Sequence, residues 1–189
     1  LEFRRVLFRS DYPIENAAVD VLDIPVEEGA RNHGMFAVSA RNETICSWVR
    51  RFQDANLGLI AIDIPEAAQR NVASLFEVAD RGLAFLSFDE SGGLLTVTYR
   101  GELYLSRRID VLPGRLSEAD AGARAQLQER IALEVQRSLD HFDRQSSSIT
   151  LSGFMLGPLS ADTGLADYLA DNIYLSVKRA DRKSTRLNS

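Results

Sequence analysis

Residues 83–110, LAFLSFDESGGLLTVTYRGELYLSRRID, determine the fold that the sequence predicts. Three short apolar runs, at 82–88, 94–99 and 102–108, are separated by Asp-Glu-Ser-Gly-Gly at 89–93 and by Arg-Gly at 100–101. Runs of this length that are bounded by glycine-containing turns are typical of β-hairpins. The stretch therefore predicts three consecutive antiparallel strands, a β-meander.

A long helix is predicted downstream of Pro113-Gly114. Ser117 and Asp120 resemble a capping box at its start. Its apolar residues recur at helical spacing and form one stripe: Leu127, Ile131, Val135, Leu139 and Phe142. A strand at 149–152, a helix at 160–172 and a last strand at 173–177 complete this half of the prediction.

The upstream half predicts two strands, a helix, a strand and a second helix. Apolar runs at 17–24 and 34–40 read as strands, and a helix follows with Asn42 placed to cap it. The continuous apolar run at 57–64 is typical of a strand buried on both faces. Pro65 suits the first turn of the next helix, whose expected buried face is Ala68, Val72, Leu75, Phe76 and Ala79. The chain is therefore an α/β protein with mixed sheets, divided between Ala79 and Gly82.

Composition excludes several classes of protein. The 189 residues are 45% hydrophobic and 26% charged, with a formal net charge of −5. No apolar run approaches the roughly 20 residues that a membrane-spanning helix needs. The single cysteine, Cys46, excludes a disulfide framework and a multi-thiolate metal site. Gly-Lys-Ser and Gly-Lys-Thr are both absent from the sequence, which excludes a P-loop.

Both ends of the chain are expected to be non-native. A DNA sequence that encodes residues 1–10 has a reverse complement that encodes residues 181–189, and this DNA resembles a short-read sequencing adapter. Removing the two flanks takes six basic and two acidic residues from the 22 and 27 of the whole chain and leaves 16 and 25. The native segment, residues 11–180, is thus clearly acidic, which argues against nucleic acid and favours a protein partner.

The turn at 89–93 carries the candidate chemistry. Glycines such as Gly92 and Gly93 let backbone N–H groups approach a phosphate, and an acid such as Asp89 can hold Mg²⁺ or a water molecule. A plain hairpin turn explains the same residues. The turn therefore leaves a phosphate site and a structural hairpin as alternatives.

Three segments, residues 59–77, 83–110 and 133–143, resemble the PilM-like proteins of type IV pilus assembly. Within that family the resemblance is greatest to the MshI group, which serves biogenesis of the mannose-sensitive haemagglutinin (MSHA) pilus. It covers nearly all of residues 11–180. The resemblance implies an actin-like ATPase fold, in which two ribonuclease H-like lobes enclose a nucleotide cleft. On this basis residues 11–80 belong to the first lobe, including its small inserted subdomain, and residues 81–180 form the second lobe.

The resemblance also implies site residues and cofactors. ATP and Mg²⁺ are the cofactors of ATP-binding members, whose second phosphate loop aligns with Ser87, Phe88 and Asp89. The usual acid of that loop is Ser87 here, and the usual glycine is Asp89. The strand on the adenosine side should end in a glycine pair, which aligns with Gly153-Phe154. The candidate nucleotide site is thus degenerate, with Ser87, Asp89, Gly92, Gly93 and Gly153 as its residues.

Three functions remain open from the sequence. The first is a scaffold in the cytoplasm, peripheral at the inner membrane, that binds the cytoplasmic tail of a bitopic pilus assembly protein. The second is a working ATPase of the same fold, in which Asp89 is a displaced metal-binding acid and Gly92 and Gly93 contact the phosphates. The third is an adaptor unrelated to pili. The degenerate loops favour the scaffold.

Overall fold

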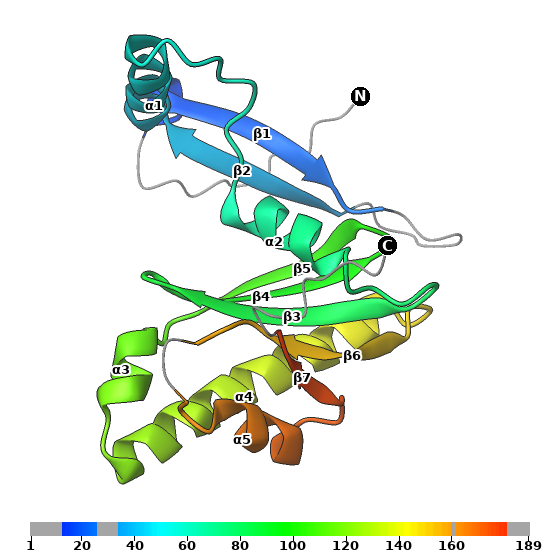
Figure 1. Ribbon diagram of the computed structural model, residues 1–189. Helices are drawn as coiled ribbons and strands as arrows, with labels where there is room; N and C mark the ends of the chain where they lie inside the picture. The colour runs from blue at the N-terminus through cyan, green and yellow to red at the C-terminus, as the bar shows by residue number, and fades with distance from the viewer. Residues whose placement is uncertain (1–12, 26–33, 160–161, 181–189) are drawn as a thin grey trace, which may run out of the picture. The chain divides into compact units, whose positions relative to one another are not determined.

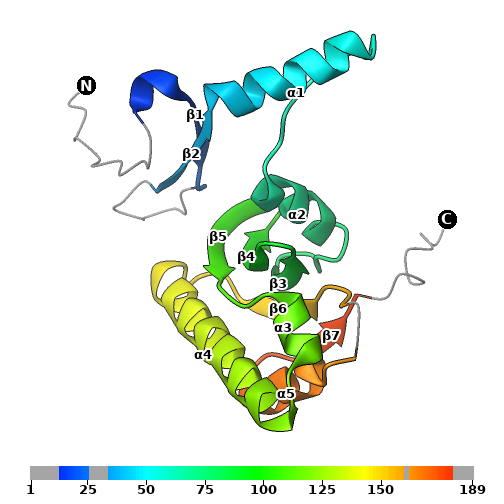
Figure 2. The same ribbon diagram turned by 90° about the vertical axis from the view of Figure 1, so that its left-hand side faces the viewer.

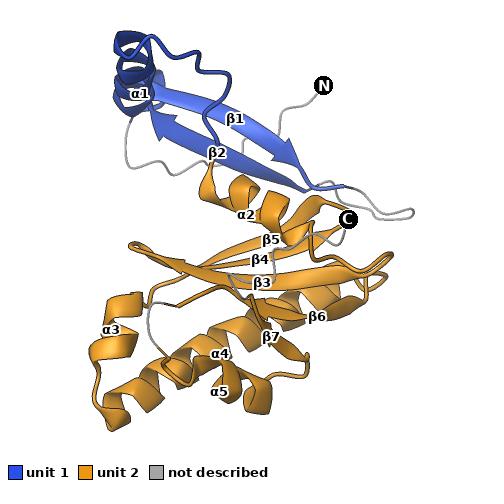
Figure 3. Cartoon of the chain, viewed as in Figure 1, with its two compact units in different colours: residues 1–63 blue, residues 64–189 orange. Residues whose placement is uncertain are grey.

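A computed structural model describes residues 13–25, 34–159 and 162–180 of the chain (Figure 1). The expected non-native flanks, 1–10 and 181–189, lie outside the described residues. The chain forms two compact units, residues 1–63 and residues 64–189, which Figure 3 distinguishes by colour. Each unit is described by itself.

The first unit is a β-hairpin followed by a helix. A short 3₁₀ helix, η1 (Ile14–Asn16), leads into β1 (Ala17–Asp23), which pairs antiparallel with β2 (Met35–Arg41), and α1 (Asn42–Asp54) follows. Both predicted strands and the helix are confirmed. Arg41 occupies the N-cap position, so Asn42 is the first helical residue and not the cap. None of the described residues in this unit is buried.

The prediction of a strand at 57–64 is wrong. These residues form no strand, and most of their apolar side chains are exposed, with Ile60 at 101% and Leu57 at 61% of full exposure. A strand needs a neighbouring strand to satisfy its backbone hydrogen-bonding groups, and neither sheet of the described residues includes this run.

The second unit is built on one five-stranded sheet. Its strands are β3 (Gly82–Asp89), β4 (Gly92–Tyr99), β5 (Glu102–Ile109), β6 (Leu151–Leu156) and β7 (Val177–Arg179), in the order β5-β4-β3-β6-β7. The first three pair antiparallel and confirm the predicted meander, whereas β3–β6 and β6–β7 are parallel pairs. The last two strands begin and end later in the chain than the predicted 149–152 and 173–177, and β7 shares only Val177 with its prediction.

Helices cover both faces of this sheet (Figures 1 and 2). α4 (Ala121–Gln145) and α5 (Leu165–Asn172) lie on one face with the short α3 (Pro113–Glu118), and α2 (Pro65–Ala73) lies on the other. The predicted stripe of α4 enters the main core, which also holds Leu86, Leu95 and Phe154. Asp120 alone caps α4, accepting a hydrogen bond from Ala123 N at 2.8 Å, while the Ser117 hydroxyl donates to Pro113 O.

α2 packs on the sheet with a different face from the one predicted. Ala67, Gln69 and Ala73 are buried against the sheet, whereas Ala68, Val72 and Leu75 are exposed. The apolar stripe is real, but a buried amide, Gln69, turns toward the strands instead. The reason lies in hydrogen bonds that the sheet offers to this amide, described below.

The boundary between the two units lies between Asp63 and Ile64. α2 is therefore part of the second unit, where it packs on β3, β4 and β5. The sequence pattern predicted a boundary between two parts of the chain near residue 80. The assignment of residues 11–80 and 81–180 to two lobes stays a prediction. Within the described ranges, no helix is both long and apolar enough to cross a membrane.

Candidate functional site

The candidate site centres on the β3–β4 hairpin. Asp89 is the last residue of β3, and Gly92 and Gly93 are the first two residues of β4. Only Glu90 and Ser91 form the turn. The strands pair through Asp89↔Gly92 and Phe88↔Gly93, so the predicted five-residue loop is a tight two-residue hairpin and both glycines lie inside a strand.

The Asp89 carboxylate organises this turn. Its Oδ1 accepts hydrogen bonds from the Ser91 N–H, at 2.8 Å, and from the Ser91 hydroxyl. Its Oδ2 lies 3.3 Å from Nη1 of Arg108 on β5. The Ser91 hydrogen bonds, followed by Arg108, hold the pKa of Asp89 below its usual value, because each stabilises the ionised form.

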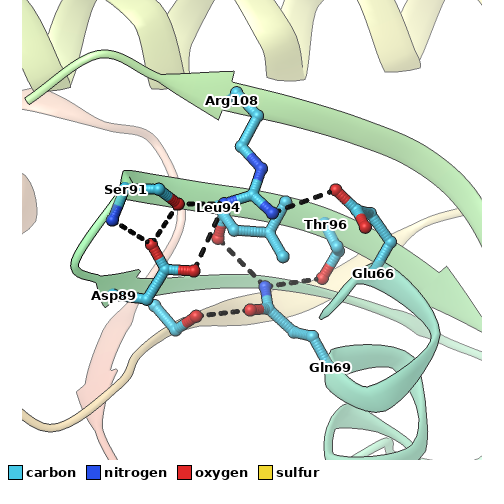
Figure 4. Close-up of polar contacts among 8 residues, drawn as sticks. Glu66, Gln69, Asp89, Ser91, Leu94, Thr96 and Arg108 are labelled. Carbon is cyan, nitrogen blue, oxygen red and sulfur yellow. Dashed lines mark hydrogen bonds and ion pairs between the residues drawn. The ribbon is translucent and has the colours of Figure 1, made fainter. Parts of the chain in front are cut away.

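Arg108 joins the hairpin to α2, as Figure 4 shows. Its Nη2 lies 3.3 Å from Oε1 of Glu66 in the first turn of α2, and its Nη1 also donates to the Ser91 hydroxyl at 3.1 Å. One guanidinium thus contacts carboxylates from two separate elements. Its planar fork of donors suits this bridging.

Gln69 lies one helical turn beyond Glu66 and contacts both strands of the hairpin. Its side-chain amide donates to the carbonyl oxygens of Phe85 on β3, at 2.9 Å, and Leu94 on β4, at 3.0 Å, and to the Thr96 hydroxyl. Its Oε1 accepts from the Ser87 hydroxyl. Ser87 lies two residues before the end of β3, and its hydroxyl contacts α2 through Gln69.

Packing against β5 accounts for both hairpin glycines. Gly92 has a φ of +128°, and a Cβ there would lie 2.7 Å from the carbonyl oxygen of Ile109. A Cβ on Gly93 would lie 3.1 Å from side-chain atoms of Ile109 and of Phe88. Gly92 therefore has no room for a side chain, and at Gly93 a side chain would require Ile109 and Phe88 to shift.

Gly153 lies within β6 and not at its end. A Cβ on Gly153 would come 3.2 Å from the Ser176 backbone oxygen, so the glycine admits the neighbouring segment. β6 continues to Leu156, and the glycine at its carboxyl end is Gly157, whose N–H donates to Leu86 O at 2.7 Å. Gly157, and not Gly153, therefore lies beside Ser87.

The hairpin residues do not fit a magnesium–phosphate site in this arrangement. Both Asp89 oxygens already have donors, and Arg108 places a positive charge beside them. The glycines are closed off by Ile109 and Phe88. No group of three or more metal-ligating side chains occurs within the part of the chain that the structure describes. Nucleotide binding by the chain stays a prediction.

A cavity of about 350 Å³ lies at the carboxyl end of β6, beside the start of α5. Gly157, Thr163 and Arg179 are among its lining residues. Arg179 lies 3.2 Å from Oδ1 of Asp162. The Thr163 hydroxyl, on a residue only 6% exposed, has no hydrogen-bond partner among the described residues. The Gly164 N–H, and then Arg179, lower the pKa of Asp162. A second cavity, of about 320 Å³, is lined by residues that include Gln69 of α2 and Ser87 and Asp89 of β3.

The sequence interpretation missed Glu66, Gln69, Arg108 and Gly157. Glu66 and Gln69 are three residues apart, a spacing that places side chains on one helix face. That spacing was a usable signal, but the apolar stripe of Val72 and Leu75 outweighed it. The pairing of Arg108 with Asp89 depends on strand register, which turn composition alone does not determine.

Comparisons with known proteins give a fold. No family model matches the chain, and no curated protein matches it significantly. A chain of a solved PilM–PilN type IV pilus biogenesis complex is similar, with a TM-score of 0.68 and 17% identity over 91% of this chain and 58% of that one. A protein of unknown function with an actin-like ATPase fold, from Bacteroides thetaiotaomicron, matches with a TM-score of 0.45 and 12% identity over 88% of this chain and 55% of that one.

The chain spans little more than half the length of these structures. The sheet that the similarity covers has the strand order β5-β4-β3-β6-β7, with three antiparallel strands followed by two parallel pairs. From the similarity to the chain of the PilM–PilN complex, the described residues between 13 and 180 form part of an actin-like ATPase fold.

Proposed function

We propose that the chain is part of an actin-like scaffold protein of type IV pilus assembly. The observation that carries this proposal is the similarity, over 91% of the chain, to a chain of the PilM–PilN pilus biogenesis complex. In this role the protein lies in the cytoplasm, peripheral at the inner membrane, and binds the cytoplasmic tail of a bitopic assembly protein. The resemblance of residues 59–77 and 83–110 to the MshI group supports an MSHA-type pilus.

The hairpin supports a scaffold over an ATPase. Asp89, Gly92 and Gly93 hold the hairpin together by internal contacts, so they offer little to a nucleotide phosphate. The acidic native segment supports docking on a protein in place of nucleic acid.

Binding of the partner tail tests this function. The full-length protein that contains this chain is titrated with a fluorescent peptide of the cytoplasmic tail of the inner-membrane pilus protein encoded beside it, and anisotropy is measured with and without Mg·ATP. We expect saturable binding that Mg·ATP leaves unchanged. A peptide of the same composition in scrambled order is the control. If the native and scrambled peptides bind alike, or neither binds, the scaffold function is refuted.

The ATPase alternative is favoured by one observation, the cavity beside Gly157 at the end of β6. A nucleotide held there would contact Arg179 and the unpartnered Thr163 hydroxyl instead of the hairpin. Peptide binding that requires Mg·ATP would favour this alternative over the plain scaffold.

A further inference from the structure

Residues 57–64 combine a sequence typical of a buried strand with an exposed position in the structure. In an extended chain their side chains would be apolar on both sides, with leucines at the odd positions 57 and 59 and isoleucines at the even positions 60, 62 and 64. A strand of this kind suits the interior of a sheet that is covered on both faces. Yet Ile60 is fully exposed and Ile62 is 44% exposed, on an irregular segment between α1 and α2 (Figure 1).

The backbone of this run is also unpaired. The Leu57 N–H donates to Phe52 O at the end of α1, and Ile64 O accepts the first hydrogen bonds of α2. Between these two ends, residues 58–62 make no backbone hydrogen bond with any part of the chain that the structure describes. A row of free N–H and C=O groups is what a strand presents when its neighbours are absent.

The helix that follows has an apolar stripe without a covering layer. Ala68, Val72 and Leu75 recur at helical spacing, but Val72 is 45% and Leu75 is 68% exposed, because α2 packs on the sheet through another face. Ala68 and Val72 also line the cavity of about 320 Å³, together with Phe85 of β3. A helix that is apolar on a second face is typical of one packed between two layers.

The kind of partner follows from what these two segments lack. A strand that is apolar on both sides needs a strand at each edge and a layer over each face, which a peptide tail does not supply. A second copy would bring the same unpaired run, and two such runs paired together would each keep one free edge. A large part of the similar chain in the PilM–PilN complex has no counterpart here, because this chain covers 58% of it.

We infer that residues 57–64 form an interior strand of a further sheet, which the rest of the full-length protein completes, and that this same part of the protein covers the stripe of Ala68, Val72 and Leu75. The predicted strand and the predicted buried face of α2 are then absent from the structure for one reason: the layer that they contact lies outside this chain. The inference uses the fold alone and does not depend on the pilus assignment.

Hydrogen exchange in the full-length protein that contains this chain tests the strand. We expect the amides of residues 59–62 to exchange at least about a thousandfold more slowly than in an unstructured peptide of the same sequence, as amides of interior strands do. Ala121 and Gly122, in the first turn of α4, give the unprotected reference, because the first N–H groups of a helix have no helical acceptor. Exchange of residues 59–62 as fast as this reference would overturn the inference. Protection that appears only when the protein dimerises would also overturn it, because a second copy would then supply the neighbouring strands.

Matched substitutions test the stripe of α2. Val72 on α2 and Leu133 on α4 are 45% and 43% exposed. We expect Val72→Asn to lower the midpoint of thermal unfolding of the full-length protein by about 5 °C or more, and Leu133→Asn to lower it by less than about 2 °C. If Val72→Asn does not fold, Val72→Ala and Leu133→Ala repeat the comparison with the same expected order. Equal shifts at the two positions would show that nothing covers the stripe and would overturn the inference.

Discussion

Gly92 shows at the scale of one residue that the hairpin is shaped by its own packing. Its φ is +128°, and a Cβ would lie 2.7 Å from Ile109 O. We expect Gly92→Ala to lower the free energy of unfolding by about 3 kcal/mol, from backbone strain and the clash together. Gly101→Ala is the control, because its φ of +75° is strained but no atom lies within 4 Å, and it should cost about 1 kcal/mol. Urea unfolding measures both, and equal losses would contradict this account of Gly92.

Gln69 is the most connected polar side chain of the site. Replacing it with methionine keeps the length but removes the hydrogen bonds to Phe85 O, Leu94 O and the Ser87 hydroxyl. We expect Gln69→Met to destabilise the chain by about 2 kcal/mol, because buried polar groups lose their partner. Gln126→Met, the same change at an exposed position of α4, should stay within about 0.5 kcal/mol. Thermal unfolding of the two variants compares them, and a Gln69→Met as stable as Gln126→Met would show that the network contributes nothing.

Asp89 gives the site a pH dependence. Its pKa is lowered by Ser91 and then by Arg108, so its contribution to stability is complete above the usual carboxyl value and is lost as the pH falls through the lowered value. Asp89→Asn should therefore destabilise the chain at neutral pH, and progressively less as the pH falls below the usual carboxyl value and through the lowered pKa of Asp89. Urea unfolding across this pH range measures the gap between variant and parent. A gap that does not change with pH would mean that the charge of Asp89 is unimportant.

At the scale of elements, the hairpins and long helices could be predicted because their signals are local. Glycine turns marked the meander, and the stripe from Leu127 to Phe142 marked α4. The wrong predictions concern features that depend on contacts with elements distant in the sequence. Periodicity located α2 but not which of its faces meets the sheet, since Gln69 is buried for its hydrogen bonds and not for its hydropathy. The strand end at Gly157 was missed because the apolar run of β6 was broken by Gly153 in the sequence.

The run at 57–64 provides a test at the same scale. Ile60 is fully exposed, although its surroundings in the sequence are typical of a buried strand. We expect Ile60→Ala to change the stability of the chain by less than about 0.5 kcal/mol. The same substitution at Ile131, which is 0% exposed on α4, should cost about 2–5 kcal/mol. Urea unfolding compares the two, and a loss above about 1 kcal/mol for Ile60→Ala would show that something covers this run.

At the scale of the whole molecule, the two units differ in how they are stabilised. The second unit contains the hydrophobic core, whereas no described residue of the first unit is buried. A two-stranded hairpin by itself is marginally stable in water, and α1 buries none of its residues. We therefore expect amides of β1, β2 and α1 to open at a free energy at least about 2 kcal/mol below those of β3 and β4. Native-state hydrogen exchange measures both sets, and equal opening energies would contradict this difference.

The fold of the whole chain could be predicted further than its function. The meander and the helix after it, together with the resemblance of three segments, gave an actin-like ATPase fold, which the similarity to a solved structure confirms. The candidate site could be located at the hairpin from Asp89, Gly92 and Gly93 alone. The structural role of these residues could not be predicted, because Arg108 and Gln69, which contact the hairpin, come from elements distant in the sequence.

Calorimetric titration of the full-length protein with Mg·ATP tests the central claim most directly, that the hairpin is satisfied by its own residues and serves structure. We predict no binding heat up to millimolar nucleotide, in the parent and in Asp89→Ala alike. Sub-millimolar binding that Asp89→Ala abolishes would contradict the claim and identify the hairpin as a nucleotide site.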